Sequence, residues 1–250
     1  MGRFFVRPEA IEAGRVRFDA DEVRHLVRVL RLRRGAILEA TDGAGRTLSV
    51  RLESLGPGAA TGTIVSEAGP TRESPCAITL GQAILKGERM AWLVQKATEL
   101  GVARIVPLVT ERMVARPVRD RSDGRRARWE RIAREAVKQC GRAWVPAVAA
   151  PRTLAEVLTE ASGHDATWLL VEGGGVPLAA VAREAGSPRR ILLLIGPEGG
   201  FTGDEVTLAE RGGVRVVGLG PRILRAESAG LVAITLCQHL FGDLGSEAPT

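Results

Sequence analysis

The apolar residues of roughly the first seventy positions fall in short runs broken by turns, a pattern typical of β-strands. The runs are RFFV, GRVRF, AILEATD, RTLSVRLESL and ATGTIVSEA, with a turn predicted at DGAG, residues 42–45. One helix interrupts them, because Asp19 and Glu22 have capping-box spacing before an apolar stripe of helical period. The predicted buried positions of that helix are Val23, Leu26, Val27 and Leu30. The pattern predicts a small β-barrel.

The pattern changes after AGPTRESP, residues 68–75, where two prolines and a glycine interrupt every periodicity. Beyond it, apolar runs without alternation (ITLGQAIL, IVPLV, TWLLV, RILLLI and VRVVGL) are separated by helical periodicities. Such runs indicate parallel strands covered on both faces by helices. We therefore expect a barrel domain at residues 1–72 and an α/β domain at residues 73–250.

Two predicted helices of the α/β domain have informative faces. The helix over residues 87–101 has one apolar face and ends at a glycine. The last helix, residues 226–241, is apolar over most of its circumference. A helix of this kind is buried either in the core or against another subunit.

Positive charge is concentrated in one block. Residues 112–142 hold eleven Lys or Arg against four acids, a local charge of +7 within a chain whose net charge is +6. A basic block suits a polyanion such as nucleic acid. A solvated face of a basic helix explains the block equally well. A second basic stripe (Arg24, Arg28 and Arg31) lies on the first predicted helix.

Composition narrows the class of protein further. The hydrophobic fraction of 45% and charged fraction of 26% are those of an ordinary globular chain. The three cysteines are too far apart for a close-spaced metal site, so we expect no metal. No run of about twenty apolar residues is present, so we expect no membrane partner and a cytoplasmic location.

Three late strands each end in a glycine-bearing loop: EGGG at 172–175, GPEGG at 196–200 and GLGP at 218–221. Ligands of parallel α/β sheets bind outside the carboxyl ends of the strands, so these loops predict a ligand cleft. Any single loop is better explained as a turn or helix cap, but three such loops in succession favour the cleft. Neither G-x-G-x-x-G at Gly196 nor a P-loop motif is present, which disfavours a pyrophosphate.

Five strings carry a resemblance to a known family: KGERMAWLVQKATELGV, EAVKQCGRAWVP, LLLIGPEGGFTGDE, LGPRILRAESAGLVAI and FGDLG. With RFFV and HLVRVLRLRRG near the start, they cover nearly the whole chain in order. The chain resembles the bacterial 16S ribosomal RNA uridine-N3 methyltransferases. The resemblance implies a PUA-like RNA-binding barrel followed by a SPOUT domain whose C-terminal part threads a trefoil knot, a rare exception among folds. It also implies a homodimer that binds S-adenosylmethionine and acts on 16S ribosomal RNA in the small subunit.

Three sets of site residues are expected: the donor-binding set follows from the resemblance, the catalytic set from the expected chemistry, and the RNA-binding set from the pattern of positive charge. The expected donor-binding residues are Leu170, Glu172, Gly173, Gly196, Pro197, Glu198, Gly199, Gly200, Leu219, Gly220, Ile223, Leu224 and Arg225. The expected catalytic residues are Arg225 and Glu227. The expected RNA-binding residues are Arg3, Arg7, Arg24, Arg28, Arg31, Arg112, Arg134, Lys138 and Arg142.

Methyl transfer to uracil N3 needs alignment and removal of one proton, which leaves negative charge on the flanking carbonyl oxygens. Arg225 is the candidate for stabilising that charge, although a surface salt bridge to Glu227 explains it without catalysis. Glu227, Glu198 or solvent is the candidate proton acceptor. Two other functions stay open: a SPOUT ribose 2′-O-methyltransferase acting on RNA, and a non-catalytic RNA-binding ribosome-assembly factor.

Overall fold

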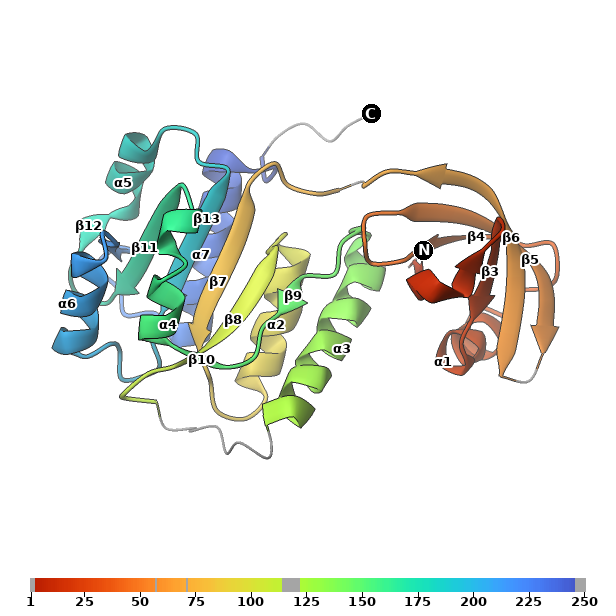
Figure 1. Cartoon of the computed structure of the whole chain (residues 1–250), viewed down its shortest axis with the longest axis horizontal. Helices are drawn as coiled ribbons and strands as arrows, with labels where there is room; N and C mark the ends of the chain where they lie inside the picture. The colour runs from red at the N-terminus through yellow and green to blue at the C-terminus, as the bar shows by residue number, and fades with distance from the viewer. Residues whose placement is uncertain (1–2, 57, 71, 114–121, 246–250) are drawn as a thin grey trace. The chain divides into compact units, whose positions relative to one another are not determined.

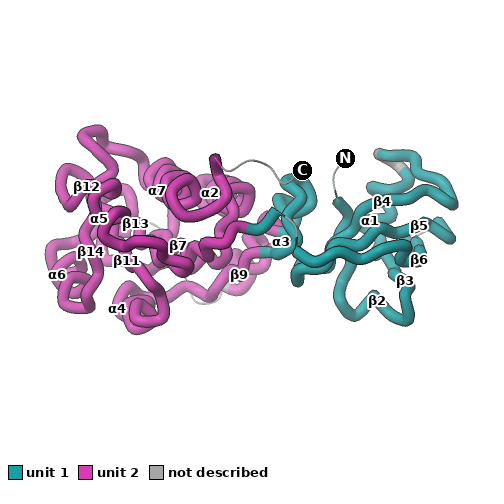
Figure 2. Tube along the Cα trace, turned by 90° about the horizontal axis from the view of Figure 1, so that it is seen from above, with its two compact units in different colours: residues 1–73, 134–145 teal, residues 74–133, 146–250 magenta. Residues whose placement is uncertain are grey.

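The computed structural model describes residues 3–56, 58–70, 72–113 and 122–245. The chain divides into two compact units, coloured separately in Figure 2. Unit 1 comprises Met1–Glu73 and Arg134–Val145, and unit 2 comprises Ser74–Ala133 and Pro146–Thr250. Residues 134–145, which the sequence placed in the second domain, therefore count with the first unit. Each unit has its own sheet.

Unit 1 is built on a six-stranded sheet in the order β1-β4-β5-β6-β3-β2. Only the β1–β4 pair is parallel, and the other neighbours are antiparallel. Alternation sets the two faces of β3, where Val16 and Phe18 are buried and Arg15 and Arg17 are exposed. The strands are β1 (Phe4–Phe5), β2 (Ile11–Glu12), β3 (Arg15–Phe18), β4 (Ile37–Thr41), β5 (Thr47–Gly56) and β6 (Ala59–Ala68).

The helix of unit 1 differs from the predicted one. Asp19 caps α1 (Ala20–Arg24) by accepting hydrogen bonds from two backbone amides, as its spacing predicts. The chain then continues as a π-helical turn, His25–Val29, instead of a regular helix. A wider turn changes which side chains face inward. Leu26 is fully buried, whereas Val27, predicted to be buried, is 44% exposed.

Unit 2 contains a fully parallel sheet in the order β10-β8-β7-β13-β11-β14-β12, with β9 pairing to β8 (Figure 1). Its central strands are the continuous apolar runs of the sequence, buried on both faces. The strands are β7 (Ala77–Ala83), β8 (Arg104–Val109), β9 (Ala147–Val148), β10 (Arg152–Thr153), β11 (Ala166–Val171), β12 (Val176–Pro177), β13 (Arg190–Ile195) and β14 (Arg215–Gly218).

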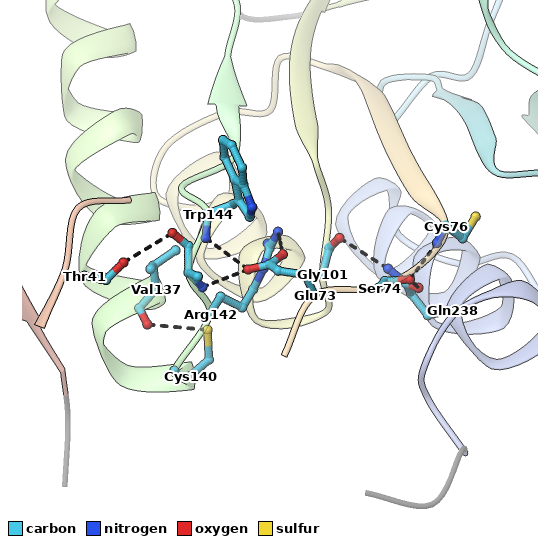
Figure 3. A network of polar contacts seen from close by, with 12 residues as sticks. Thr41, Glu73, Ser74, Cys76, Gly101, Val137, Cys140, Arg142, Trp144 and Gln238 are labelled. Atoms are coloured by element: carbon cyan, nitrogen blue, oxygen red, sulfur yellow. Dashed lines mark hydrogen bonds and ion pairs between the residues drawn. The ribbon is translucent and has the colours of Figure 1, made fainter. Parts of the chain in front are cut away.

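The helices of unit 2 lie on both faces of this sheet. The helix α7 packs on β7, β13 and α2, whereas α4 packs with α6 (Figure 1). At the end of α7, Gln238 accepts a hydrogen bond from Ser74 and donates one to the carbonyl of Gly101, which follows α2 (Figure 3). The helices are α2 (Arg89–Glu99), α3 (Ser122–Cys140, whose last seven residues count with unit 1), α4 (Leu154–Leu158), α5 (Leu178–Ala185), α6 (Gly203–Arg211) and α7 (Ala226–Phe241).

The path of the chain between β14 and α7 positions the site. The strand β14 lies beyond β11, on the side away from β13, whereas α7 packs against β13 and β7. Residues 219–225 therefore return past the carboxyl ends of β11 and β13. Such a return is the path that the predicted knot requires. Because the sheet is parallel, the carboxyl ends of all its strands lie at the edge that residues 219–225 pass.

Candidate active site

A cavity of about 580 Å³ lies at the carboxyl ends of the central strands. Its walls come from the ends of β11 and β13, the loop after β13, and the returning segment before α7. This volume lies within the range of small-molecule and cofactor sites. The lining residues are Arg89, Arg112, Leu170, Val171, Glu172, Ile195, Gly196, Pro197, Glu198, Gly199, Gly200, Phe201, Leu219, Gly220, Arg222, Ile223, Leu224, Arg225, Ala226 and Ala229.

The structure brings together twelve of the thirteen residues predicted for donor binding, and the exception is Gly173. Gly173 lies in the loop after β11 with a positive φ of 65° and is not part of the wall. The loop after β13 folds tightly on itself. A Cβ added at Gly196 would lie 3.2 Å from the carbonyl carbon of Gly200 and from the ring of Phe201. A glycine at this position therefore lets the backbone approach closely.

The cavity combines apolar walls with hydrogen-bonding backbone and charged side chains. Apolar walls come from Leu170, Ile195, Phe201 and Leu219, among others. Such a mixture suits an adenosine group, which needs apolar surface and a few polar contacts. Four arginines line the cavity against two carboxylates, those of Glu172 and Glu198. The excess of positive charge also suits an anionic partner.

The two predicted catalytic residues occupy different environments. Arg225 is the N-cap residue of α7, is exposed and lines the cavity. Glu227 lies in the first turn of the same helix, is only 8% exposed and does not line the cavity. Its Oε2 atom is buried with no hydrogen-bond partner among the described residues. The geometry supports contact with a ligand for Arg225 and gives none for Glu227.

Two arginines that the sequence did not assign to the cavity hold the loop after β13. Arg89 Nη1 lies 2.9 Å from Glu198 Oε1, and Arg89 Nε lies 3.9 Å from Glu227 Oε1. Arg112 donates hydrogen bonds to the carbonyls of Gly199 (3.1 Å) and Phe201 (3.4 Å). Arg112 was predicted to bind RNA, and the structure instead engages it with this loop. The KGERM string was the only sequence signal for Arg89.

Three of the residues predicted to bind RNA are buried inside unit 1. Arg3 is paired with Glu39 and also donates to the carbonyl of Gly141. Arg142 is 2.8 Å from Glu73, whose other oxygen accepts the backbone amides of residues 143 and 144 (Figure 3). These contacts occupy both arginines inside unit 1, so we correct their assignment: neither side chain is exposed to bind RNA.

Lys138 is the third of these buried residues. Its Nζ lies 2.6 Å from the carboxylate of Glu22, and it also contacts Glu135. Burial raises the pKa of Glu22, partly offset by Lys138. Burial lowers the pKa of Lys138, but its contacts with Glu22 and Glu135 outweigh burial and raise it overall. Glu22, the capping-box glutamate of the sequence pattern, thus serves as the ion-pair partner of Lys138. Lys138 is buried and is no longer assigned to the RNA-binding surface.

The remaining predicted RNA-binding residues fall into three groups. Arg7, Arg24 and Arg31 are exposed in unit 1, the first two beside Asp19 and Asp21. The guanidinium of Arg134 lies 4.7 Å from the centre of the Phe5 ring, a cation–π contact. The side chain of Arg28 lies outside the described residues. Arg7, Arg24 and Arg31 therefore form the exposed basic group that we retain.

Comparisons with known proteins bear on this site. A family model described as "RNA methyltransferase domain" matches residues 72–238, and one described as "RNA methyltransferase PUA domain" matches residues 18–65. The ribosomal RNA small subunit methyltransferase E of Synechocystis sp. is 35% identical over 241 residues, which are 96% of this chain and 78% of the relative. The chain belongs to the ribosomal RNA small subunit methyltransferase E family.

Further members of the methyltransferase E family agree over the same length. The Bacillus subtilis member is 30% identical over 248 residues, 96% of each chain. The solved structure of the Neisseria gonorrhoeae member bound to S-adenosyl methionine is 36% identical, with a TM-score of 0.87, and covers 97% of this chain and 99% of its own. The predicted fold class, a PUA-type domain before an α/β RNA methyltransferase domain, is confirmed. No described helix is long and apolar enough to cross a membrane.

Proposed function

We propose that this protein transfers a methyl group from S-adenosylmethionine to N3 of a uridine in 16S ribosomal RNA of the small subunit. The observation that carries the proposal is the cavity at the strand ends, where residues 170–172, 196–201 and 219–224 meet beside Arg225. Its size, apolar walls and close backbone suit the donor. Family membership supports the reaction class, and the members named above are small-subunit RNA methyltransferases.

The side chains of the cavity have distinct tasks in this reaction. When bound, S-adenosylmethionine supplies an electrophilic methyl group. Arg225 lines the cavity, and the planar donors of its guanidinium suit the carbonyl oxygens that become negative as N3 loses its proton. Of the two candidate carboxylates, only Glu198 lines the cavity. We therefore propose that Glu198, and not Glu227, accepts the N3 proton.

Donor binding is the first expectation to test. Purified protein should bind S-adenosylmethionine with one site per chain. Binding should persist in the presence of a metal chelator, because the proposed contacts to the donor come from residues of the cavity wall alone. Isothermal titration calorimetry measures the stoichiometry and affinity. Absence of saturation at millimolar donor contradicts the proposal.

The methylated product decides between base and ribose chemistry. Small subunits incubated with enzyme and donor are digested to nucleosides and separated by mass spectrometry. The proposal expects 3-methyluridine. A 2′-O-methylated nucleoside would identify a ribose methyltransferase instead, and no methylation with intact RNA binding would identify an assembly factor.

RNA binding should use the exposed arginines of unit 1 and depend steeply on salt. Phosphate contacts release counterions, so replacing Arg24 or Arg31 by alanine should flatten the slope of log affinity against log salt by about one unit each. Filter binding at several salt concentrations measures the slope. Arg183→Ala, on the exposed face of α5 in the other unit, is the matched control and should leave the slope unchanged. An RNA affinity that does not change with salt concentration would contradict the proposal that these arginines bind RNA phosphates.

We also propose that the protein is a homodimer joined through α7. Residues 228–241 contain no Asp, Glu, Lys or Arg, so the outer face of the helix carries no charged side chain. Ile234 and Cys237 are fully buried, whereas Val232 and Leu240 are 37% and 48% exposed. With Leu236 between them, the last two form one stripe at four-residue spacing. An uncharged, apolar stripe on a long helix fits a second copy of the same surface.

A further inference from the structure

Arg89 lies between two carboxylates on different elements, of which only Glu198 lines the cavity. Its guanidinium is 2.9 Å from Glu198, in the loop after β13, and 3.9 Å from Glu227, in the first turn of α7. Arg89 itself is the first residue of α2. One side chain therefore links three elements: α2, the loop after β13, and the helix that begins just after Arg225.

Local helix energetics do not explain an arginine at this position. A cation in the first turn of a helix is disfavoured by the helix dipole, whereas a carboxylate there is favoured. Glu227 is thus well placed on α7, but Arg89 is poorly placed on α2 unless partners offset the cost. The carboxylates of Glu198 and Glu227 are those partners.

The remainder of α2 fixes where Arg89 stands. Met90, Leu93 and Val94 are buried in the core of unit 2, and α2 packs along α7. The backbone of Arg89 is therefore anchored, and its side chain lines the cavity at 44% exposure. A rigid base with a half-exposed charged end is suited to hold a loop in one position.

We propose that Arg89 is a positioning residue for methyl transfer, which acts by holding the Glu198 carboxylate at the cavity wall. The inference rests on the proposed function. Glu198 is 35% exposed, so without its partner the side chain can turn toward solvent and away from the reacting atoms. Glu227, at 10% side-chain exposure, would lose the cation nearest to its carboxylate among the contacts described here, which would disturb the turn next to Arg225.

The proposal predicts strong coupling between Arg89 and Glu198. Arg89→Ala should slow single-turnover methylation about tenfold and Glu198→Gln about a hundredfold, and the double variant should be slowed far less than the product of the two effects. Arg89→Lys should recover part of the rate, because an ammonium keeps the positive charge for Glu198 but lacks the planar guanidinium, whose Nη1 and Nε face the two carboxylates. RNA affinity should not change, because Arg89 acts through Glu198.

The experiment is a double-mutant cycle at saturating RNA and donor, with donor affinity, RNA affinity and melting temperature measured for every variant. Arg215→Ala is the matched control. It removes another exposed ion pair of unit 2, that of Arg215 with Glu184, and Arg215 does not line the cavity. It should keep the wild-type rate. If Arg89→Ala melts early, Arg89→Gln, which is shorter and uncharged but keeps a polar side chain, replaces it in the cycle.

Three outcomes would overturn the inference: a wild-type rate for Arg89→Ala, a double variant slowed by the product of the two single effects, or a loss of RNA affinity with the chemical step intact. Each differs from failure of the proposed function, in which the wild-type protein itself neither binds the donor nor methylates RNA.

Discussion

Arg225→Ala is expected to slow the chemical step about a hundredfold to a thousandfold, the usual loss for a group that stabilises charge only in the transition state. Arg225 caps α7 with extended backbone (φ −61°, ψ 149°), and its side chain makes no cap hydrogen bond. The substitution therefore removes the guanidinium from the cavity wall without removing a helix cap. Single-turnover kinetics with saturating RNA and donor measures the step directly.

Donor affinity is the control for this variant, and calorimetry should show little change. Arg225→Lys should recover only part of the rate, because a point charge cannot reproduce a planar fork of donors. If Arg225→Ala weakens donor binding and leaves the chemical step intact, Arg225 is a donor-binding residue and its catalytic assignment is wrong.

Leu240→Asp is expected to convert the dimer into monomers and to abolish methylation with it. Leu240 is 48% exposed at the end of the apolar stripe of α7, so the monomer tolerates a charge there. Two carboxylates brought together in an apolar interface would be desolvated without partners, which costs several kcal/mol. The dimer dissociation constant should rise by about two orders of magnitude or more. Sedimentation velocity over a concentration series measures it.

The matched control is Leu208→Asp, at a leucine of α6 that is 45% exposed. It introduces the same charge at a similar exposure but outside α7, so the protein should remain dimeric and active. A fully active monomeric wild-type protein would contradict the proposed dimer. A lower melting temperature in Leu240→Asp, with no such change in Leu208→Asp, would indicate damage to the monomer.

The sequence predicted the centre of unit 2 well because its signals are local. The apolar run at residues 190–195 and the helix at 226–241 have the same bounds in the structure as in the prediction. Glycines mark where these runs end, and parallel strands place all such ends at one edge of the sheet. The cavity residues from Gly196 to Gly200 followed from these two facts together with the family resemblance.

The errors concern charges whose partners lie far away in the chain. Arg3, Lys138 and Arg142 read as solvated cations, but their carboxylates are 36, 116 and 69 residues away, respectively. Nothing near Lys138 indicates that Glu22 will neutralise it. The same reason applies to Arg89, since its partner Glu198 is 109 residues away. Charge patterns within one helix therefore cannot separate a binding surface from a buried pair.

The return of residues 219–225 past the strand ends has a consequence for the order in which the protein matures. Chains are made from the N-terminus, and contacts between distant residues form slowly. The last wall of the cavity comes from residues 219–229, after every strand of the sheet has been synthesised. A nascent chain that has formed the whole parallel sheet still lacks a complete donor cavity. Binding of the donor thus reports completion of the C-terminal segment, and a bound donor would favour the finished chain over earlier folding intermediates.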